Sequence, residues 1–141
     1  MRIARRVSLL LSLVAFVHSA SARAAETKDL KGTPQVKAYE TLLKAVQAGD
    51  FEGYKKSMTK AAGKEIDKQI KDTGMDPKKG MGMLKALTPT DLKYTDLKVD
   101  QRKATLLATG KMDGEINKGA IELEQEDGQW KVAKQSWTNS K

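Results

Sequence analysis

The side chains that could do chemistry in this chain are few, and their types exclude several enzyme classes. The sequence has no cysteine and one histidine, His18, so thiolate nucleophiles, disulfides and cysteine-ligated zinc are excluded. Histidine, the commonest general base, occurs only in an N-terminal segment that we expect to be removed. Ser57 and Ser136 lack a nucleophile-elbow motif, and the carboxylates follow no metal-binding spacing. We therefore expect no catalytic residue, no metal and no cofactor.

Five residues could instead contact a ligand: Tyr54, Met83, Tyr94, Trp130 and Lys134. The tyrosines offer hydroxyl groups, the methionine adapts to apolar shapes, and the tryptophan offers a flat wall. Each also has a structural interpretation. The tyrosines and the tryptophan are typical of half-buried core positions, and Met83 is typical of an ordinary weak helix rather than of a lid over a pocket.

Lys134 raises a question of register. Strict alternation from Trp130 puts Lys134 on the apolar face of a strand, opposite Ile121, and Trp137 on the other face. Burying an unpaired ammonium group is expensive. A bulge near Ala133 would turn Lys134 outward and Trp137 inward. Alternatively, Lys134 reaches the mouth of a pocket, where its charge could meet an anionic ligand.

The first 24 residues are typical of a secretory signal peptide. Three arginines within the first six residues precede an apolar run over 7–17, and small residues follow. This run of 11 residues is shorter than the roughly 20 that a membrane-spanning helix needs. We expect cleavage between Ala24 and Ala25, export to a periplasm or to the outside of the cell, and no membrane span in the mature chain.

The mature chain is expected to contain one small domain. We predict a flexible lead-in over 25–33, a domain over 34–138 and a tail over 139–141. Arg102 is the only arginine after the leader, and the other basic residues are lysines. Because lysine is a hydrated point charge and arginine is preferred for bidentate phosphate contacts, we expect a solvated surface and no nucleic-acid binding.

Helical periodicity fills the first half of this domain. Capping residues and breakers predict a helix that starts after Thr33 and ends at Gly49, a second that follows Asp50, and a third over 61–73. Asp67 and Lys71 form a predicted i,i+4 ion pair on the third helix. A weaker fourth helix follows Asp76-Pro77 and stops before Pro89.

From Leu92 onward the period changes to two. Turns centred on 101–102, 113–114 and 127–128 separate predicted strands over 92–100, 103–112, 115–126 and 129–138. The three turns agree on one apolar face, which carries Leu97, Val99, Ala104, Leu106, Ile121, Leu123, Trp130 and Val132. The predicted fold class is α+β, with N-terminal helices packed on a curved four-stranded antiparallel meander.

Two stretches resemble the nuclear-transport-factor-2-like superfamily. "AVQAGDFEGYKKSM" (45–58) is similar to its helix, Gly-Asp turn and second helix, and "ELEQEDGQWKVAKQSW" (122–137) is similar to its final hairpin. The chain resembles its small exported bacterial domains of unknown function, with lumazine-binding-like and polyketide-cyclase-like relatives. The resemblance covers about 34–138 and implies a cone with a pocket at its wide end. It also implies homodimerisation through the sheet.

Three functions remain open. The first is an exported, non-enzymatic domain that binds a small apolar or anionic molecule or a protein partner. The second is an isomerase or cyclase of the ketosteroid-isomerase type, for which the resemblance implies an aspartate base, a tyrosine and a protonated acid facing the pocket. The predicted inner sheet face carries no Asp or Glu, which disfavours this function. The third is a structural or stress-related envelope protein that dimerises through its sheet.

Overall fold

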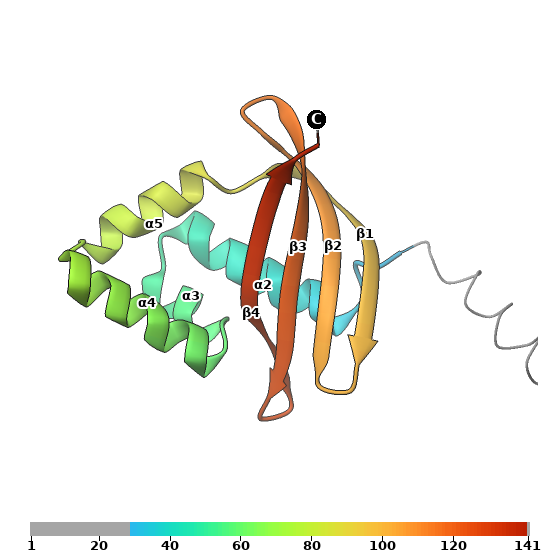
Figure 1. Ribbon diagram of the computed structural model, residues 1–141, viewed down its shortest axis with the longest axis horizontal. Helices are drawn as coiled ribbons and strands as arrows, with labels where there is room; N and C mark the ends of the chain where they lie inside the picture. Colours follow the sequence, from blue (N-terminus) through green and yellow to red (C-terminus); the bar gives the residue numbers. More distant parts are fainter. Residues whose placement is uncertain (1–28, 141) are drawn as a thin grey trace, which may run out of the picture.

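The computed structural model describes residues 29–140, so the predicted signal peptide and residues 25–28 of the predicted lead-in lie outside the described residues. Figure 1 shows a helical part packed on one face of a sheet, with two helices extending past the sheet. The helices are α2 (Pro34–Ala48), α3 (Phe51–Lys56), α4 (Lys60–Thr73) and α5 (Pro77–Ala86). The strands are β1 (Thr90–Asp100), β2 (Lys103–Met112), β3 (Glu115–Glu126) and β4 (Gln129–Asn139). The predicted α+β class is confirmed.

The described helices begin where a short polar side chain caps them. Thr33 accepts a hydrogen bond from the first turn of α2, and Asp50 does the same for α3. Thr59 caps α4, which therefore begins at Lys60, one residue before the predicted start at 61. Asp76 caps α5. Each cap satisfies a backbone N–H that has no partner within its helix, so the boundaries follow local chemistry.

The sheet is an antiparallel meander in the order β1-β2-β3-β4. Its register follows the predicted turns, because Leu106 pairs with both Leu97 and Ile121, and Leu123 pairs with Val132. Residues 113–114 and 127–128 have positive φ angles, as the tight two-residue turns of hairpins require. β1 begins at Thr90, two residues before the predicted start, and its pairing with β2 shifts twice.

A bulge interrupts β4 at the predicted place. Val132 pairs with Leu123 and Lys134 pairs with Glu122, which leaves Ala133 without a partner in the register. Lys134 is therefore exposed on the outer face of the sheet. The pairing of Ile121 with Lys134 expected from strict alternation is wrong, because the extra residue puts Gln135 opposite Ile121.

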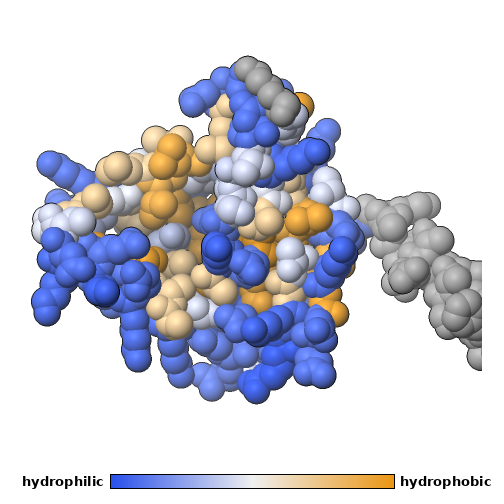
Figure 2. All heavy atoms as spheres, in the orientation of Figure 1, coloured by the Kyte–Doolittle hydropathy of each residue, from blue (hydrophilic) through white to orange (hydrophobic). Residues whose placement is uncertain are grey.

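The core lies between α2 and the inner face of the sheet. Val36, Tyr39 and Leu42 of α2 are fully buried, and the main strand contributions are Ala104, Leu106, Ala108, Ile121, Leu123 and Val132. Val99 was predicted on this face but is 52 % exposed, because it is the next-to-last residue of an edge strand. In Figure 2, hydrophilic residues surround the lower rim of the molecule, and apolar residues gather between α4 and α5.

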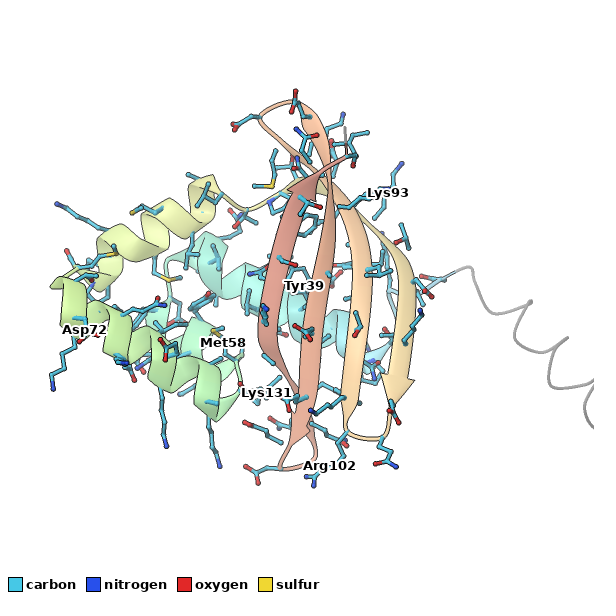
Figure 3. The ribbon with its side chains drawn as sticks, in the orientation of Figure 1. Tyr39, Met58, Asp72, Lys93, Arg102 and Lys131 are labelled. Atoms are coloured by element: carbon cyan, nitrogen blue, oxygen red, sulfur yellow. The ribbon has the colours of Figure 1, made fainter. Side chains whose placement is uncertain are left out.

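The edge of β4 is covered by the junction between α3 and α4. Met58 forms a parallel bridge with Val132, and Figure 3 places Met58 between the helices and this strand. Thr59 N donates to Val132 O at 2.9 Å, and Val132 N donates to Ser57 O at 3.0 Å. These bonds satisfy backbone groups that an edge strand would otherwise expose, and they fix where α4 begins.

Gly119 gives a direct test of this packing. It faces Trp137 across the β3–β4 ladder, and a Cβ atom at Gly119 would lie 2.6 Å from the indole ring. We expect Gly119→Ala to lower the free energy of unfolding by about 1–3 kcal/mol, because the ring would have to move within a packed site. Urea unfolding followed by circular dichroism measures the change.

The matched control is Gly63→Ala in α4. A Cβ atom there meets nothing within 4 Å, so the same substitution should stabilise the helix by about 0.5–1 kcal/mol. Stabilisation of the chain by Gly119→Ala as well would show that Trp137 does not pack over Gly119.

Candidate functional site

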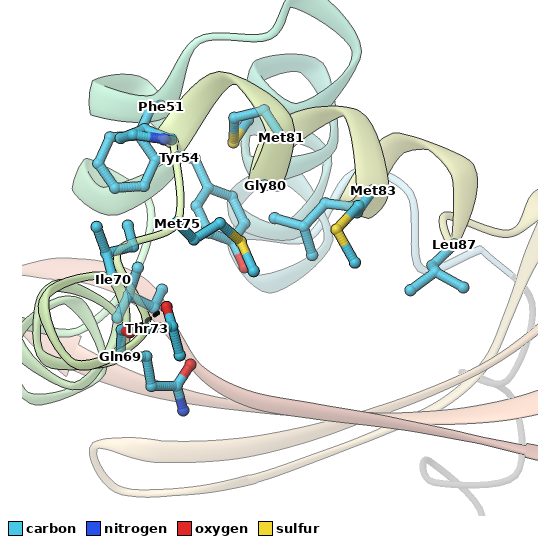
Figure 4. A pocket seen from close by; sticks show the side chains of 13 residues that line it. Phe51, Tyr54, Gln69, Ile70, Thr73, Met75, Gly80, Met81, Met83 and Leu87 are labelled. Carbon is cyan, nitrogen blue, oxygen red and sulfur yellow. Dashed lines mark hydrogen bonds between the residues drawn. The ribbon is translucent and has the colours of Figure 1, made fainter.

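An apolar hollow lies between α4 and α5, with α3 at its base. We call it the α4–α5 groove (Figure 4). Its volume is about 360 Å³, within the range of small-molecule sites. It is lined by Phe51, Tyr54, Ile66, Gln69, Ile70, Thr73, Met75, Pro77, Gly80, Met81, Met83, Leu84 and Leu87. None of these side chains carries a charge, so the groove suits an uncharged apolar occupant.

The two long walls come from amphipathic helices. α4 has Ile66, Ile70 and Thr73 at spacings of four and three, which puts them on one face. No residue of α4 is fully buried, because its apolar face borders the groove instead of the sheet. On α5, Met81 is buried in the core while Met83 lies along the opening. Methionine side chains fit ligands of varied shape.

Part of this apolar surface is open to solvent. Met75 is 40 % exposed, Met83 57 % and Leu87 62 %. Figure 2 shows the same surface as apolar atoms between the two helices, with hydrophilic residues along the outer side of α4. A contiguous exposed apolar surface that is rimmed by polar residues is typical of a ligand-binding groove or an interaction site.

The base of the groove is held in place by α3. Tyr54 is buried, and desolvation raises the pKa of its hydroxyl, which stays neutral. Lys55 lies 5.0 Å from the centre of the Phe51 ring and donates a hydrogen bond of 3.0 Å to Asp67 of α4. This hydrogen bond raises the pKa of Lys55. The predicted partner of Asp67 was Lys71, whereas the structure pairs Asp67 with Lys55 and so ties α3 to α4.

A second hollow of about 220 Å³ lies deeper, beside the inner face of the sheet. It shares Tyr54, Leu84 and Leu87 with the α4–α5 groove. Gln135 lines this hollow, and its Oε1 accepts hydrogen bonds from Tyr39 Oη at 2.8 Å and from Trp137 Nε1 at 3.2 Å. The sequence reasoning did not find Gln135. The only signal for it is the bulge, which turns this residue inward.

Burial also raises the pKa of the hydroxyl groups of Tyr39 and Tyr94. Desolvation is the largest cause that raises the pKa of Tyr39 above its ordinary value, and the nearby Tyr94 raises it further. Desolvation raises the pKa of Tyr94 to about 12, and the Glu40 carboxylate adds to this shift. Both hydroxyls are therefore neutral donors at neutral pH.

The structure does not bring the five predicted ligand residues into one site. Tyr54 and Met83 line the α4–α5 groove, and Tyr94 lies on β1 beside Glu40. Trp130 lines a separate hollow near the β3–β4 turn, and Lys134 is exposed on the outer face of the sheet. The periodicity of a sequence assigns residues to faces, but it does not tell which faces enclose the same space.

The described residues offer neither a metal site nor a membrane-spanning helix. Within 29–140 there is no cluster of three or more His, Cys, Asp or Glu side chains that could hold a metal ion. In the same range no helix is both long enough and apolar enough to cross a membrane.

Comparisons with known proteins give a likeness at the level of the fold. No protein-family model matches the chain, and no curated protein matches it. Among solved structures, an NTF-2-like protein of unknown function from Shewanella oneidensis MR-1 is similar, at 13 % identity and a TM-score of 0.48. The match covers 75 % of this chain and 97 % of that one. The α+β class itself rests on the helices and meander described above, and this likeness carries no argument about function.

The raised pKa of Tyr94 predicts a loss of stability at alkaline pH. The unfolded chain ionises this hydroxyl near pH 10.0, whereas the folded chain holds its proton to about pH 12. The unfolded state therefore binds fewer protons above pH 10, and the free energy of unfolding should fall there. Below that pH the contribution of Tyr94 is fully present.

Tyr94→Phe isolates this contribution. Urea unfolding at a series of pH values from about 8 to about 11 should show a shallower decline for the variant than for the parent chain. Every other ionisable residue is the same in both proteins, so the comparison isolates residue 94. Declines of equal slope would contradict the assignment.

Proposed function

We propose that this protein is a non-enzymatic binding domain that holds a small, uncharged apolar molecule in the α4–α5 groove. The observation that carries the proposal is the lining of the groove, which is apolar, partly open to solvent and free of charged side chains. An apolar molecule that enters would cover Met75, Met83 and Leu87. Removing this surface from water is worth about 25 cal/mol for each Å², which favours occupancy by an apolar molecule.

The chemistry of both hollows favours binding over catalysis. The residues that line the α4–α5 groove and the hollow beside the sheet include no Asp or Glu among the described residues. The isomerase alternative needs a carboxylate that faces bound substrate. Tyr39 and Gln135 already use their hydroxyl and carbonyl groups on each other, so they support the sheet more directly than they support a reaction.

The dimerisation alternative has less support than the groove. The outer face of the sheet carries the cross-strand neighbours Glu122 and Lys134, which are exposed and of opposite charge. A solvated face of this kind is satisfied without a partner. The exposed apolar side chains of the groove, Met75, Met83 and Leu87, would instead be stabilised if a ligand removed them from water.

Substitution of Met83 tests the proposed site. Met83 lies along the groove and is 57 % exposed, so Met83→Glu should leave the fold intact while placing a carboxylate against the ligand. We expect the affinity for Nile red, a neutral apolar dye, to fall at least about tenfold, because the new charge must be desolvated. Fluorescence titration of the dye measures the affinity.

Val99→Glu is the matched control. Val99 is similarly exposed, at 52 %, and lies on β1 outside the residues that line the groove. This variant should bind the dye as the parent chain does. Equal affinities for all three proteins, or no binding by the parent chain, would sink the proposal.

We also propose that the domain acts after export, since the N-terminal segment has the charge, apolar run and small-residue exit of a signal peptide. Expression of the full chain in a bacterium with an intact secretion system should yield a mature protein that starts at Ala25. Intact-mass measurement of the extracytoplasmic fraction checks this. A protein that stays in the cytoplasm with residues 1–24 attached would contradict export.

A further inference from the structure

A third hollow differs from the α4–α5 groove because charged side chains border it. We call it the lysine hollow. It lies between the first half of α2, the end of α3 and the β3–β4 turn, and its volume is about 590 Å³. It is lined by Pro34, Lys37, Ala38, Thr41, Gly53, Lys56, Ser57, Gly128, Gln129, Trp130 and Lys131. Three lysines and one aromatic ring thus border the same space.

The three lysines come from three different elements, so their convergence is a property of the fold. Lys37 belongs to α2, Lys56 to α3 and Lys131 to β4. Lys131 Nζ donates a hydrogen bond of 2.7 Å to the main-chain oxygen of Lys56, which holds its ammonium group beside the end of α3. Figure 3 shows Lys131 on the half of β4 near the β3–β4 turn.

These three lysines form no ion pair within the described chain. Glu124 lies opposite Lys131 across the β3–β4 ladder, but its carboxylate lies 4.0 Å from Lys103 Nζ. The lining has no Asp or Glu, and within 29–140 none of the three lysines has a carboxylate oxygen within 4.0 Å. The two acidic residues before Gly128 are engaged elsewhere. Glu126 accepts from Lys60 N at 3.1 Å, and Asp127 lies 3.4 Å from Lys60 Nζ. The hollow therefore presents a net positive field to solvent.

Trp130 and Ser57 offer contacts of fixed geometry beside these charges. Trp130 is half-buried and forms part of the wall, so a flat group could pack against the indole. Ser57 Oγ donates to Gly53 O at 2.9 Å, which leaves the serine oxygen free to accept. Lysine ammonium groups attract a compact anion without demanding a fixed geometry.

We propose that the lysine hollow binds a small organic anion in which a phosphate or similarly charged group is attached to a flat ring. The anion faces Lys37, Lys56 and Lys131, and the ring lies against Trp130. This site is separate from the apolar groove and goes beyond the function proposed for it, since three lysines border the hollow and no charged side chain borders the groove.

Phenyl phosphate is the probe, and the two indole N–H signals of nitrogen-labelled protein are the readout. The chain has two tryptophans, and a Trp130→Phe variant assigns their signals. We expect phenyl phosphate to shift the Trp130 signal and not the Trp137 signal, with an affinity that falls as salt is added. Inorganic phosphate and benzyl alcohol should each bind more weakly, because each supplies only half of the recognised chemistry.

Lysine variants test the charges. Lys37→Gln and Lys131→Gln should each weaken phenyl phosphate binding about three- to tenfold. Lys37 makes no ion pair within the described chain, so its variant should remain folded even if that of Lys131 does not. Lys118→Gln, an exposed lysine on β3 that does not border the hollow, should have no effect.

Three results would overturn the proposal. The first is an unmoved Trp130 signal at saturating phenyl phosphate. The second is inorganic phosphate binding as tightly as phenyl phosphate, and the third is an equal loss of affinity in Lys118→Gln. The readout does not involve the α4–α5 groove, so failure here leaves the apolar-binding proposal untouched.

Discussion

The bulge at Ala133 is the constraint on which the rest of the structure depends. It adds one residue to β4 and so reverses which side chains face the helices from that point on. Without it, Lys134 would carry an unpaired ammonium group into the apolar core, and Trp137 would lie outside. Burying an isolated charge costs several kcal/mol, far more than the lost ladder contact at one residue.

The consequences of the bulge reach the core directly. It turns Gln135 inward, where its side-chain oxygen accepts from both Tyr39 and Trp137. It also sets Trp137 over Gly119, the one position on the neighbouring strand where the ring can lie against the backbone. The hydrogen bond from Tyr39 to Gln135 thereby joins the middle of α2 to the end of β4, and the bond from Trp137 to Gln135 lies within β4.

The same strand places the α4–α5 groove. Val132, immediately before the bulge, pairs with Leu123 on one side and bonds with Ser57 and Thr59 on the other. These bonds end α3 and start α4 at the edge of the sheet. α4 and α5 therefore extend past β4, as Figure 1 shows, and their apolar faces meet each other over a space that the sheet does not fill.

Local signals in the sequence were sufficient for most of the fold. Caps and breakers such as Thr33, Asp50 and Gly74 mark helix ends through hydrogen bonds within a few residues, and the hairpin turns fix the register because the side-chain period is two. The cost of burying Lys134 argued against strict alternation and left two alternatives, a bulge or a position at the mouth of a pocket; the structure has the bulge. Elements defined by such short-range rules can be predicted from the residues alone.

The candidate sites were less accessible, because they depend on how elements meet. Tyr54 and Met83 were predicted as ligand residues and line the same groove. No sequence rule, however, linked them to Leu87, or Trp130 to the lysines of α2 and α3. Asp67 illustrates the difference, since its helical neighbour Lys71 was the obvious partner and the observed partner is Lys55 on another helix. Contacts between elements need the tertiary arrangement.

The central claim is that an uncharged apolar molecule occupies the α4–α5 groove, and methionine-methyl NMR tests it most directly. Met75, Met81 and Met83 line the groove, whereas Met58 and Met112 do not. Titration of protein carrying labelled methionine methyl groups with Nile red should shift the first three signals and leave Met58 and Met112 in place. Shifts confined to Met112, which lies beside the other hollow, or no shifts at saturating dye, would contradict the account.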